Sequence, residues 1–284
     1  FDTITHFNIN IASNISIAGN YLNTTGNLNC TAGTVTFVGN SSSIQMTSGL
    51  TWVFNNLTVS KTAGQTLTHS VGSFTINLNY SCTSGSFTST SVGTIIFGGG
   101  VAASISHAGT TTTFNNIQIN KGANIDVTST TDWRVSGVYT NTAGDLVCTG
   151  GTVTWAGAAA QTIQINGGTA QFNNFTVALS GGFTLTHNVG SFTIFGSYSC
   201  TSGSFNSTTG TITMGGGANS SIADTSSGTT SFFGLTINKT AAGLQVTSTS
   251  DWTVNSAYTN TQGDLVCTGG TVTMSGTVGA NLSI

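Results

Sequence analysis

Hydrophobic and polar residues alternate along this chain in short runs, which is the pattern of β-strands. Runs of β-branched and aromatic residues, such as TVTW at 152–155, are separated by Gly, Ser and Asn, and none keeps the spacing of a helix beyond one turn. Successive strands start near Phe114, Trp133, Thr152 and Phe172, so the steps between them are nearly even. A step of about 20 residues is typical of one turn, or rung, of a parallel β-solenoid.

A longer repeat of about 59 residues organises these strands. The five tyrosines of the chain recur at nearly constant intervals and mark one position of this repeat: Tyr21, Tyr80, Tyr139, Tyr198 and Tyr258. The position six residues earlier holds Phe74, Trp133, Phe192 and Trp252. Because equivalent residues stack along the axis of a solenoid, we predict that these aromatic side chains form a stacked core.

The repeat divides one continuous domain, residues 1–284, into five modules. Their predicted bounds are 1–53 (a shortened module), 54–113, 114–171, 172–231 and 232–284, the last completed by residues 1–6 of the next copy. Two versions alternate, since GDLVCTGGTVT at 144–154 recurs at 263–273. With three steps of about 20 residues in each module, we predict an all-β fold, a parallel β-solenoid of about 14 rungs.

A five-bladed β-propeller is the alternative fold, because five modules could also close into a ring. Two features disfavour it. Two alternating versions of a module cannot close evenly into a ring of five. The first module is also short, since the segment from Phe7 to Tyr21 is about half as long as the equivalent segment from Phe54 to Tyr80.

The chain carries very few charges, and this excludes several functions. Only 4% of the residues are charged, Pro is absent, and the formal net charge is −3. The cations are Lys61, Lys121, Arg134 and Lys239, too few to neutralise a nucleic-acid backbone. No apolar stretch approaches the ~18 residues of a membrane span. Few titrating groups also predict a stability that is nearly independent of pH.

Candidate catalytic residues reduce to one cluster, Asp126, Asp132 and Arg134. Polysaccharide cleavage needs paired carboxylates, or a carboxylate set with a base, so only this cluster could supply it. On a strand, Asp132 and Arg134 share one face while Trp133 points inward, which describes a surface ion pair. Phosphate-loop, metalloprotease and nucleophile motifs are missing. We therefore expect no enzyme activity, no cofactor and no metal.

Histidines and cysteines are spaced too widely to act together. His69 and His187 lie about six rungs apart, so they cannot share a metal and are interpreted as satisfied polar residues. One cysteine falls in each module: Cys30, Cys82, Cys148, Cys200 and Cys267. Their spacing is too large for a disulfide within the chain and predicts buried thiols, while a link between chains stays open.

Three segments carry a family resemblance: FNNLTVSKTAG at 54–64, GGTVTWAG at 150–157 and SFFGLTINKTAAG at 231–243. They resemble the repeats of secreted β-solenoid proteins of bacterial and archaeal cell surfaces, of the right-handed β-helix kind seen in adhesins. The resemblance implies an extracellular or cell-surface protein with an adhesive or filamentous role and, as possible partners, surface glycans. Pectate-lyase-like enzymes share the architecture, so fold alone does not exclude catalysis.

The two ends of the sequence suggest self-assembly. Six residues precede FNI at Phe7, and six residues follow the earlier equivalent of Ile284 before the next module begins, so a second copy would continue the repeat in register. Open solenoid ends invite such head-to-tail stacking into a filament. The predicted assembly residues are Phe1, Ile4, Phe7, Ile9, Leu282 and Ile284.

The favoured function is therefore a structural subunit of an extracellular filament whose partner is a second copy of itself. The alternative is a fragment or passenger of a long β-solenoid adhesin. A polysaccharide-active enzyme and an ice-binding protein are less favoured. Thr-x-Thr pairs such as Thr152 with Thr154 are typical of ice-binding solenoids, but the clearest pairs recur once per module and not once per rung.

Overall fold

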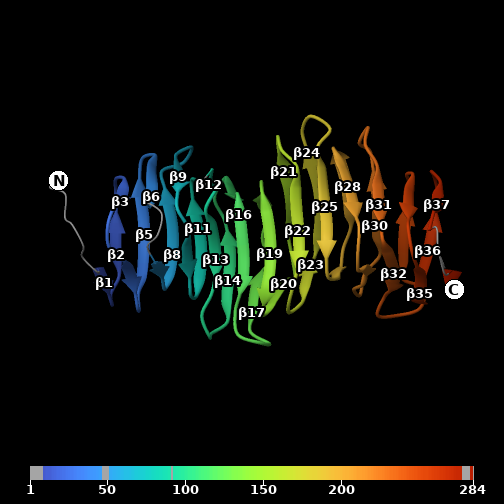
Figure 1. Ribbon diagram of the computed structural model, residues 1–284, viewed down its shortest axis with the longest axis horizontal. Helices are drawn as coiled ribbons and strands as arrows, with labels where there is room; N and C mark the ends of the chain where they lie inside the picture. The colour runs from blue at the N-terminus through green and yellow to red at the C-terminus, as the bar shows by residue number, and fades with distance from the viewer. Residues whose placement is uncertain (1–8, 47–50, 91, 277–281, 284) are drawn as a thin grey trace.

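The strands coil into a parallel β-solenoid of about 12 turns in this computed structural model, which describes residues 9–46, 51–90, 92–276 and 282–283. Figure 1 shows the strands crossing the long axis of a rod, with the first strands at one end and the last at the other. Each strand pairs in parallel with the strand three places later, which excludes the propeller. The described residues form no helix that could cross a membrane.

Three long sheets form the sides of the rod, and we name them sheets A, B and C in the order in which the chain enters them. Sheet A contains β1 (Ile9–Ile11), β4 (Leu28–Cys30), β7 (Trp52–Phe54), β10 (Phe74–Ile76), β13 (Thr94–Phe97), β16 (Asn116–Asn120), β19 (Val138–Ala143), β22 (Gln161–Ile165), β25 (Thr184–Val189), β28 (Ser204–Ser207), β31 (Thr230–Phe232), β34 (Trp252–Val254) and β37 (Val272–Met274).

Sheet B contains β2 (Ile15–Ile17), β5 (Thr34–Gly39), β8 (Asn56–Lys61), β11 (Asn79–Ser84), β14 (Ala103–His107), β17 (Asp126–Ser129), β20 (Asp145–Cys148), β23 (Ala170–Phe172), β26 (Phe192–Ile194), β29 (Thr211–Met214), β32 (Gly234–Asn238), β35 (Tyr258–Gln262) and β38 (Leu282–Ser283). Sheet C contains β3 (Tyr21–Asn23), β6 (Ser42–Met46), β9 (Thr66–Val71), β12 (Ser86–Ser89), β15 (Thr111–Phe114), β18 (Trp133–Val135), β21 (Thr152–Gly157), β24 (Asn174–Leu179), β27 (Tyr198–Ser202), β30 (Ser220–Asp224), β33 (Gln245–Ser248) and β36 (Asp264–Cys267).

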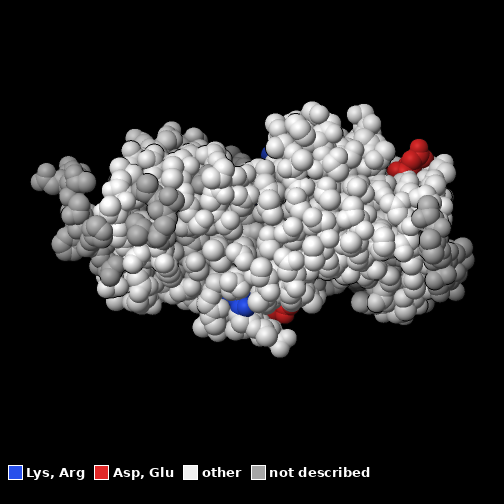
Figure 2. All heavy atoms as spheres, viewed as in Figure 1, with Lys and Arg blue, Asp and Glu red and all other residues white. Residues whose placement is uncertain are grey.

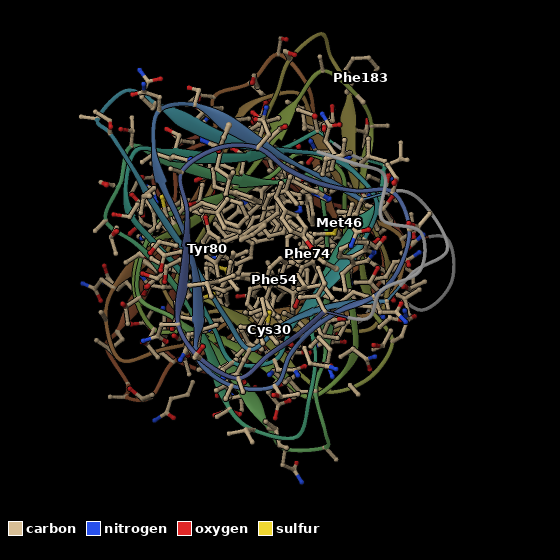
Figure 3. All side chains as sticks on the ribbon, turned by 90° about the vertical axis from the view of Figure 1, so that its left-hand side faces the viewer. Cys30, Met46, Phe54, Phe74, Tyr80 and Phe183 are labelled. Atoms are coloured by element: carbon tan, nitrogen blue, oxygen red, sulfur yellow. The ribbon has the colours of Figure 1, made fainter. Side chains whose placement is uncertain are left out.

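Alternate residues of most strands between β4 and β34 point into a continuous core. In β21, Val153 and Trp155 are buried while Thr152 and Thr154 face outward. Figure 3, which looks along the rod, shows labelled core side chains such as Tyr80 in the interior and Phe183 outside. This period of two is what the sequence alternation predicted, and it lets one apolar face of each strand pack against the two other sheets.

The repeated module does not contain three turns, which corrects the prediction. The tyrosines of successive modules lie in β3, β11, β19, β27 and β35, so one module spans eight strands, whereas three turns need nine. Turns also differ in length, since the step from Ile9 to its partner Leu28 is shorter than the step from Phe205 to its partner Thr230. The prediction of about 14 rungs assumed about 20 residues in every turn. Many turns are longer because their corner loops are longer, so the predicted number was too high.

Eight strands in three sheets place equivalent residues of successive modules on different sides of the rod. Tyr21, Tyr80 and Tyr139 lie in sheets C, B and A, and they therefore do not stack on one another. The residue in register with Tyr80 is Leu57 on one side and Ile105 on the other. Eight of the nine predicted residues are buried in the core, and Tyr21 is half-buried.

Candidate functional site

A surface groove of about 490 Å³ lies where β15, β18 and β21 of sheet C begin. Its residues are His107, Gly109, Thr110, Thr111, Thr112, Asp132, Trp133, Arg134, Thr152 and Thr154. The end of β14, the connection to β15 and the start of β15 supply the first five, and the starts of β18 and β21 supply the rest. This groove contains two of the three residues that the sequence proposed as a charged cluster, so it is the candidate site.

Arg134 lies in the middle of the groove, with its side chain exposed between buried Trp133 and Val135. Its neighbours in register are Thr113 on the preceding turn and Thr154 on the following turn. Among the described residues, no carboxylate lies close enough to Arg134 to form an ion pair. Trp133 points inward as predicted, but the predicted ion pair between Asp132 and Arg134 is wrong.

Asp132 instead braces the corner of the solenoid. Its Oδ1 accepts the backbone N–H of Thr152 on the next turn at 2.7 Å. The equivalent residues of the other modules accept the equivalent N–H groups at 2.6–2.9 Å: Asn14, Ser73, Ser191 and Asp251. Amide, hydroxyl and carboxylate oxygens all serve at this position, so the acceptor is what the fold needs there. The carboxylate of Asp132 therefore has a structural explanation.

Asp126, the third residue of the cluster, lies outside the groove. It belongs to β17 in sheet B, where it is in register with Asp145 of β20 on the next turn. Asp145 accepts hydrogen bonds from the backbone N–H and the hydroxyl of Thr169 at 2.7 and 2.8 Å. The structure thus separates Asp126 from Asp132 and Arg134, and it sets Asp126 beside Asp145 on sheet B, which the sequence did not predict.

His107 forms the wall of the groove and is anchored to the core. Its Nδ1 lies 3.1 Å from the hydroxyl of Thr112, and that hydroxyl lies 3.0 Å from the phenol of buried Tyr80. The same segment recurs two modules later in the chain, and we call that later segment the repeat copy. There, Asp224 takes the place of His107, and the hydroxyl of Thr230 joins the Asp224 carboxylate to the phenol of Tyr198, at 2.7 and 2.8 Å. The same corner therefore carries an imidazole in one copy and a carboxylate in the other.

The three lysines are buried, which the sequence did not predict. Lys61, Lys121 and Lys239 are each at most 2% exposed. The ammonium of Lys121 donates to the backbone carbonyls of Asn77, Gly98 and Val101. Removal from water lowers the pKa of all three, that of Lys121 to about 8.

A sequence signal for the buried lysines exists. Lys121 and Lys239 each bond to the first glycine of a GGG segment on the preceding turn, through the carbonyls of Gly98 and Gly215. The central glycine of each segment has positive φ, 81° at Gly99 and 85° at Gly216, a region that L side chains rarely adopt. A GGG segment followed by a lysine one turn later is therefore the sequence pattern that indicates a buried lysine at Lys121 and Lys239.

The cysteines are mostly buried, as the sequence predicted, whereas the burial of His69 and His187 was not predicted. His69 and His187 lie in the core, and their Nδ1 atoms are 2.9 Å from the hydroxyls of Ser89 and Ser207. Burial lowers the pKa of both imidazoles to about 4. The cysteines are free thiols, four buried and Cys267 exposed, and burial raises the pKa of Cys148 to about 12. No described group of three metal-binding side chains is close enough to hold an ion.

Of the predicted assembly residues, Phe1, Ile4, Phe7 and Ile284 lie outside the described residues. Ile9 belongs to β1 and is 42% exposed. Leu282 belongs to β38, where its backbone is in register with Tyr258 of β35.

Sheet C carries a column of outward hydroxyls on successive turns. Its members, in register, are Ser43, Thr68, Thr88, Thr113, Thr154, Thr176 and Ser199, interrupted once by Arg134. Sheet B has a shorter column of Thr193, Thr213, Thr236 and Thr259. The clearest Thr-x-Thr pairs recur once per module; the columns instead consist of single Thr and Ser residues from different modules, which the sequence did not predict.

Comparisons with known proteins identify no relative. No family model matches the chain, and no curated protein or solved structure is significantly similar to it. The β-solenoid is shown by the structure alone, and the resemblance to cell-surface proteins stays an expectation.

Proposed function

We propose that this chain is a rod-forming structural subunit of an extracellular fibre, in which copies stack head to tail. An adhesin rod in which the solenoid continues within one longer chain is the alternative. The proposal includes no catalytic step, because Asp126, Asp132 and Arg134 do not form one site. What supports it is the state of the last turns of the rod.

The supporting comparison is between two nearly identical segments. In the middle of the rod, Cys148 and Trp155 are at most 1% exposed. At the equivalent positions near the end, Cys267 is exposed and Met274 is 37% exposed. The sequence around both pairs is GDLVCTGGTVT, so local sequence does not explain the difference. A further turn, supplied by a second copy or by a longer chain, would bury these side chains and pair the edges of β36 and β37 that no described strand pairs.

The sides of the rod would not oppose such stacking. Three of the four cations are buried, and Figure 2 shows charged residues only at isolated points of the visible face. Low surface charge weakens the repulsion that keeps soluble proteins apart. Copies of the rod could therefore approach end to end at ordinary salt concentration.

Electron microscopy and analytical ultracentrifugation of the purified chain test the proposal. We expect unbranched fibres from the wild type and dispersed rods from Met274→Asp, which places a charge on the uncovered core. Thr273→Asp is the matched control, because Thr273 is also exposed and lies on the outward face of the same strand. Wild-type protein that stays monomeric at high concentration, or Met274→Asp protein that still forms fibres, would contradict head-to-tail stacking.

The hydroxyl column of sheet C favours ice binding as a second candidate. Seven Thr and Ser side chains in register give an array of donors and acceptors on neighbouring turns about 4.8 Å apart, four on one side of Arg134 and three on the other. Measuring the thermal hysteresis of a solution of the monomeric rod tests ice binding. A solution whose freezing and melting temperatures are equal would contradict it.

A further inference from the structure

Arg134 is the one cation that the described part of the rod presents to solvent. The chain contains four Lys and Arg residues, and the three lysines are buried with their ammonium groups bonded to carbonyl or hydroxyl oxygens. Arg134 has no hydrogen-bond or ion-pair partner within the described structure. A guanidinium offers five donors in a planar fork, and here the whole fork is available to a ligand.

The groove around Arg134 is lined by polar groups. Thr110, Thr111, Thr152 and Thr154 supply hydroxyls on both sides of the guanidinium. Each hydroxyl can donate and accept, so a ligand that carries several hydroxyls can exchange hydrogen bonds across the groove. Trp133, the one tryptophan of the lining, is 1% exposed and offers no ring face for stacking. A volume of about 490 Å³ lies within the usual range for small-molecule sites.

The charges of the groove select against a polyanion. Asp132 lies beside Arg134 in the lining, so the formal charges of these two residues cancel. The Oδ1 of Asp132 is held by the N–H of Thr152, which fixes this carboxylate as part of the corner. A ligand with many negative charges would meet Asp132, whereas a ligand with one carboxylate can bind Arg134 alone.

We propose that this groove binds a saccharide that carries a single carboxylate, such as a uronic acid. The carboxylate would pair with the guanidinium of Arg134, and the sugar hydroxyls would bond to the threonines on either side. This inference does not depend on fibre formation, because the groove lies on the side of the rod, on sheet C.

The repeat copy provides an internal control. There, Thr253 occupies the position of Arg134, and Asp251 and Asp224 occupy those of Asp132 and His107. That corner has two carboxylates and no cation, so it should not bind an acid. Arg134→Thr converts the groove to the residue that the repeat already uses at this position, and it changes only an exposed side chain.

The test is isothermal titration calorimetry with methyl glucuronide and methyl glucoside, which differ only in the carboxylate. We expect the wild type to bind the glucuronide at least about ten-fold more tightly than the glucoside, and Arg134→Thr to lose this preference without a change in melting temperature. Thr75→Val, on the outward face of sheet A, should leave binding unchanged.

Equal binding of the two glycosides would overturn the proposal, and so would a preference that survives in Arg134→Thr. Sodium sulfate serves as an oxyanion without hydroxyls. Sulfate that displaces the glucuronide at equal concentration would show that the threonines do not recognise a sugar, which also overturns it. Failure to form fibres would have no bearing on this result.

Discussion

Two corners of the rod, where the chain leaves one sheet for the next, have the same backbone arrangement but different buried side chains: Lys121 follows β16, and Leu179 ends β24. Both side chains are buried at the same position of the module. In both, the chain on the next turn approaches closely at a glycine with φ of 78°, Gly144 or Gly203, where an added Cβ would meet the Cβ of the lysine or leucine at 2.5 or 2.8 Å. Only the lysine donates to carbonyls, among them that of Gly98.

This difference shows that the corner needs a long side chain but does not need its charge. Leu179 fills its corner with apolar contacts alone. Lys121 loses hydration on burial, and the hydrogen bonds to three carbonyls offset that cost. The carbonyls of Gly98 and Val101 belong to the GGG corner, where Gly99 has a φ of 81°. In the leucine corner, Gly157 takes the place of Gly99 and also has a positive φ, 155°, but alanines take the places of the two outer glycines. The full GGG segment therefore occurs with the lysine and not with the leucine.

Shortening the side chain should produce the largest effect. We expect Lys121→Ala to lower the free energy of unfolding by about 4 kcal/mol, because it leaves a cavity and three carbonyls without a donor. Leu179→Ala should cost about 3 kcal/mol, because only the cavity remains. Lys121→Met should cost less than half as much as Lys121→Ala, since it refills the space and removes a buried charge. Urea unfolding followed by circular dichroism measures all three.

Acid should destabilise the rod equally through two buried histidines, one near the lysine corner of Lys61, which is equivalent to that of Lys121, and one near the leucine corner of Leu179. His69 lies eight residues after Lys61, His187 lies eight after Leu179, and both imidazoles have a pKa of about 4 against about 6.5 when unfolded. The unfolded chain therefore takes up protons first, and stability that is present above pH 6.5 is lost as the pH falls towards 4, by about 3 kcal/mol per histidine. We expect His187→Asn to remove half of this loss. An acid profile unchanged by that substitution would contradict the assignment.

Of the two corners, only the lysine corner should change the free energy of unfolding as the pH is raised, and this change should be smaller than those of the preceding predictions. The pKa of Lys121 is about 8 in the folded chain and about 10.5 in the unfolded chain, so the native state releases its proton first as the pH rises. Between pH 7.5 and 10 the wild type should gain about 2 kcal/mol relative to Lys121→Met. Thiols and tyrosines act in the opposite direction, but both proteins contain them, so they cancel in the difference. Equal profiles would mean that the ammonium is not buried in solution.

The composition suggested that the stability is nearly independent of pH, whereas the buried groups predict the two pH dependences of the free energy of unfolding given above. Few groups titrate, but the structure buries the histidines and lysines, and burial shifts their pKa values. Composition counts charges, whereas stability depends on how far each pKa moves on folding.

The sequence predicted the class of fold but not its pitch. Alternation in segments such as 152–155 identified the strands and their buried face, and the five tyrosines identified the module. Turn length depends on corner loops, so eight strands per module could be read only from the pairing of, for example, Tyr80 with Leu57. The groove could not be predicted for the same reason, because Thr111, Arg134 and Thr152 meet only when three turns are stacked.

The sequence by itself determined that this protein is an all-β repeat with few charges whose alternate residues form a core, because period-two alternation and module spacing are local properties. Tertiary structure decided which repeats become neighbours. Each strand pairs with the strand three places later, whereas modules repeat every eight strands, so equivalent residues lie on different sides of the rod and face non-equivalent residues of the neighbouring turns. That pairing between turns brings three carbonyls to Lys121, sets Asp126 beside Asp145, and places Arg134 between Thr113 and Thr154.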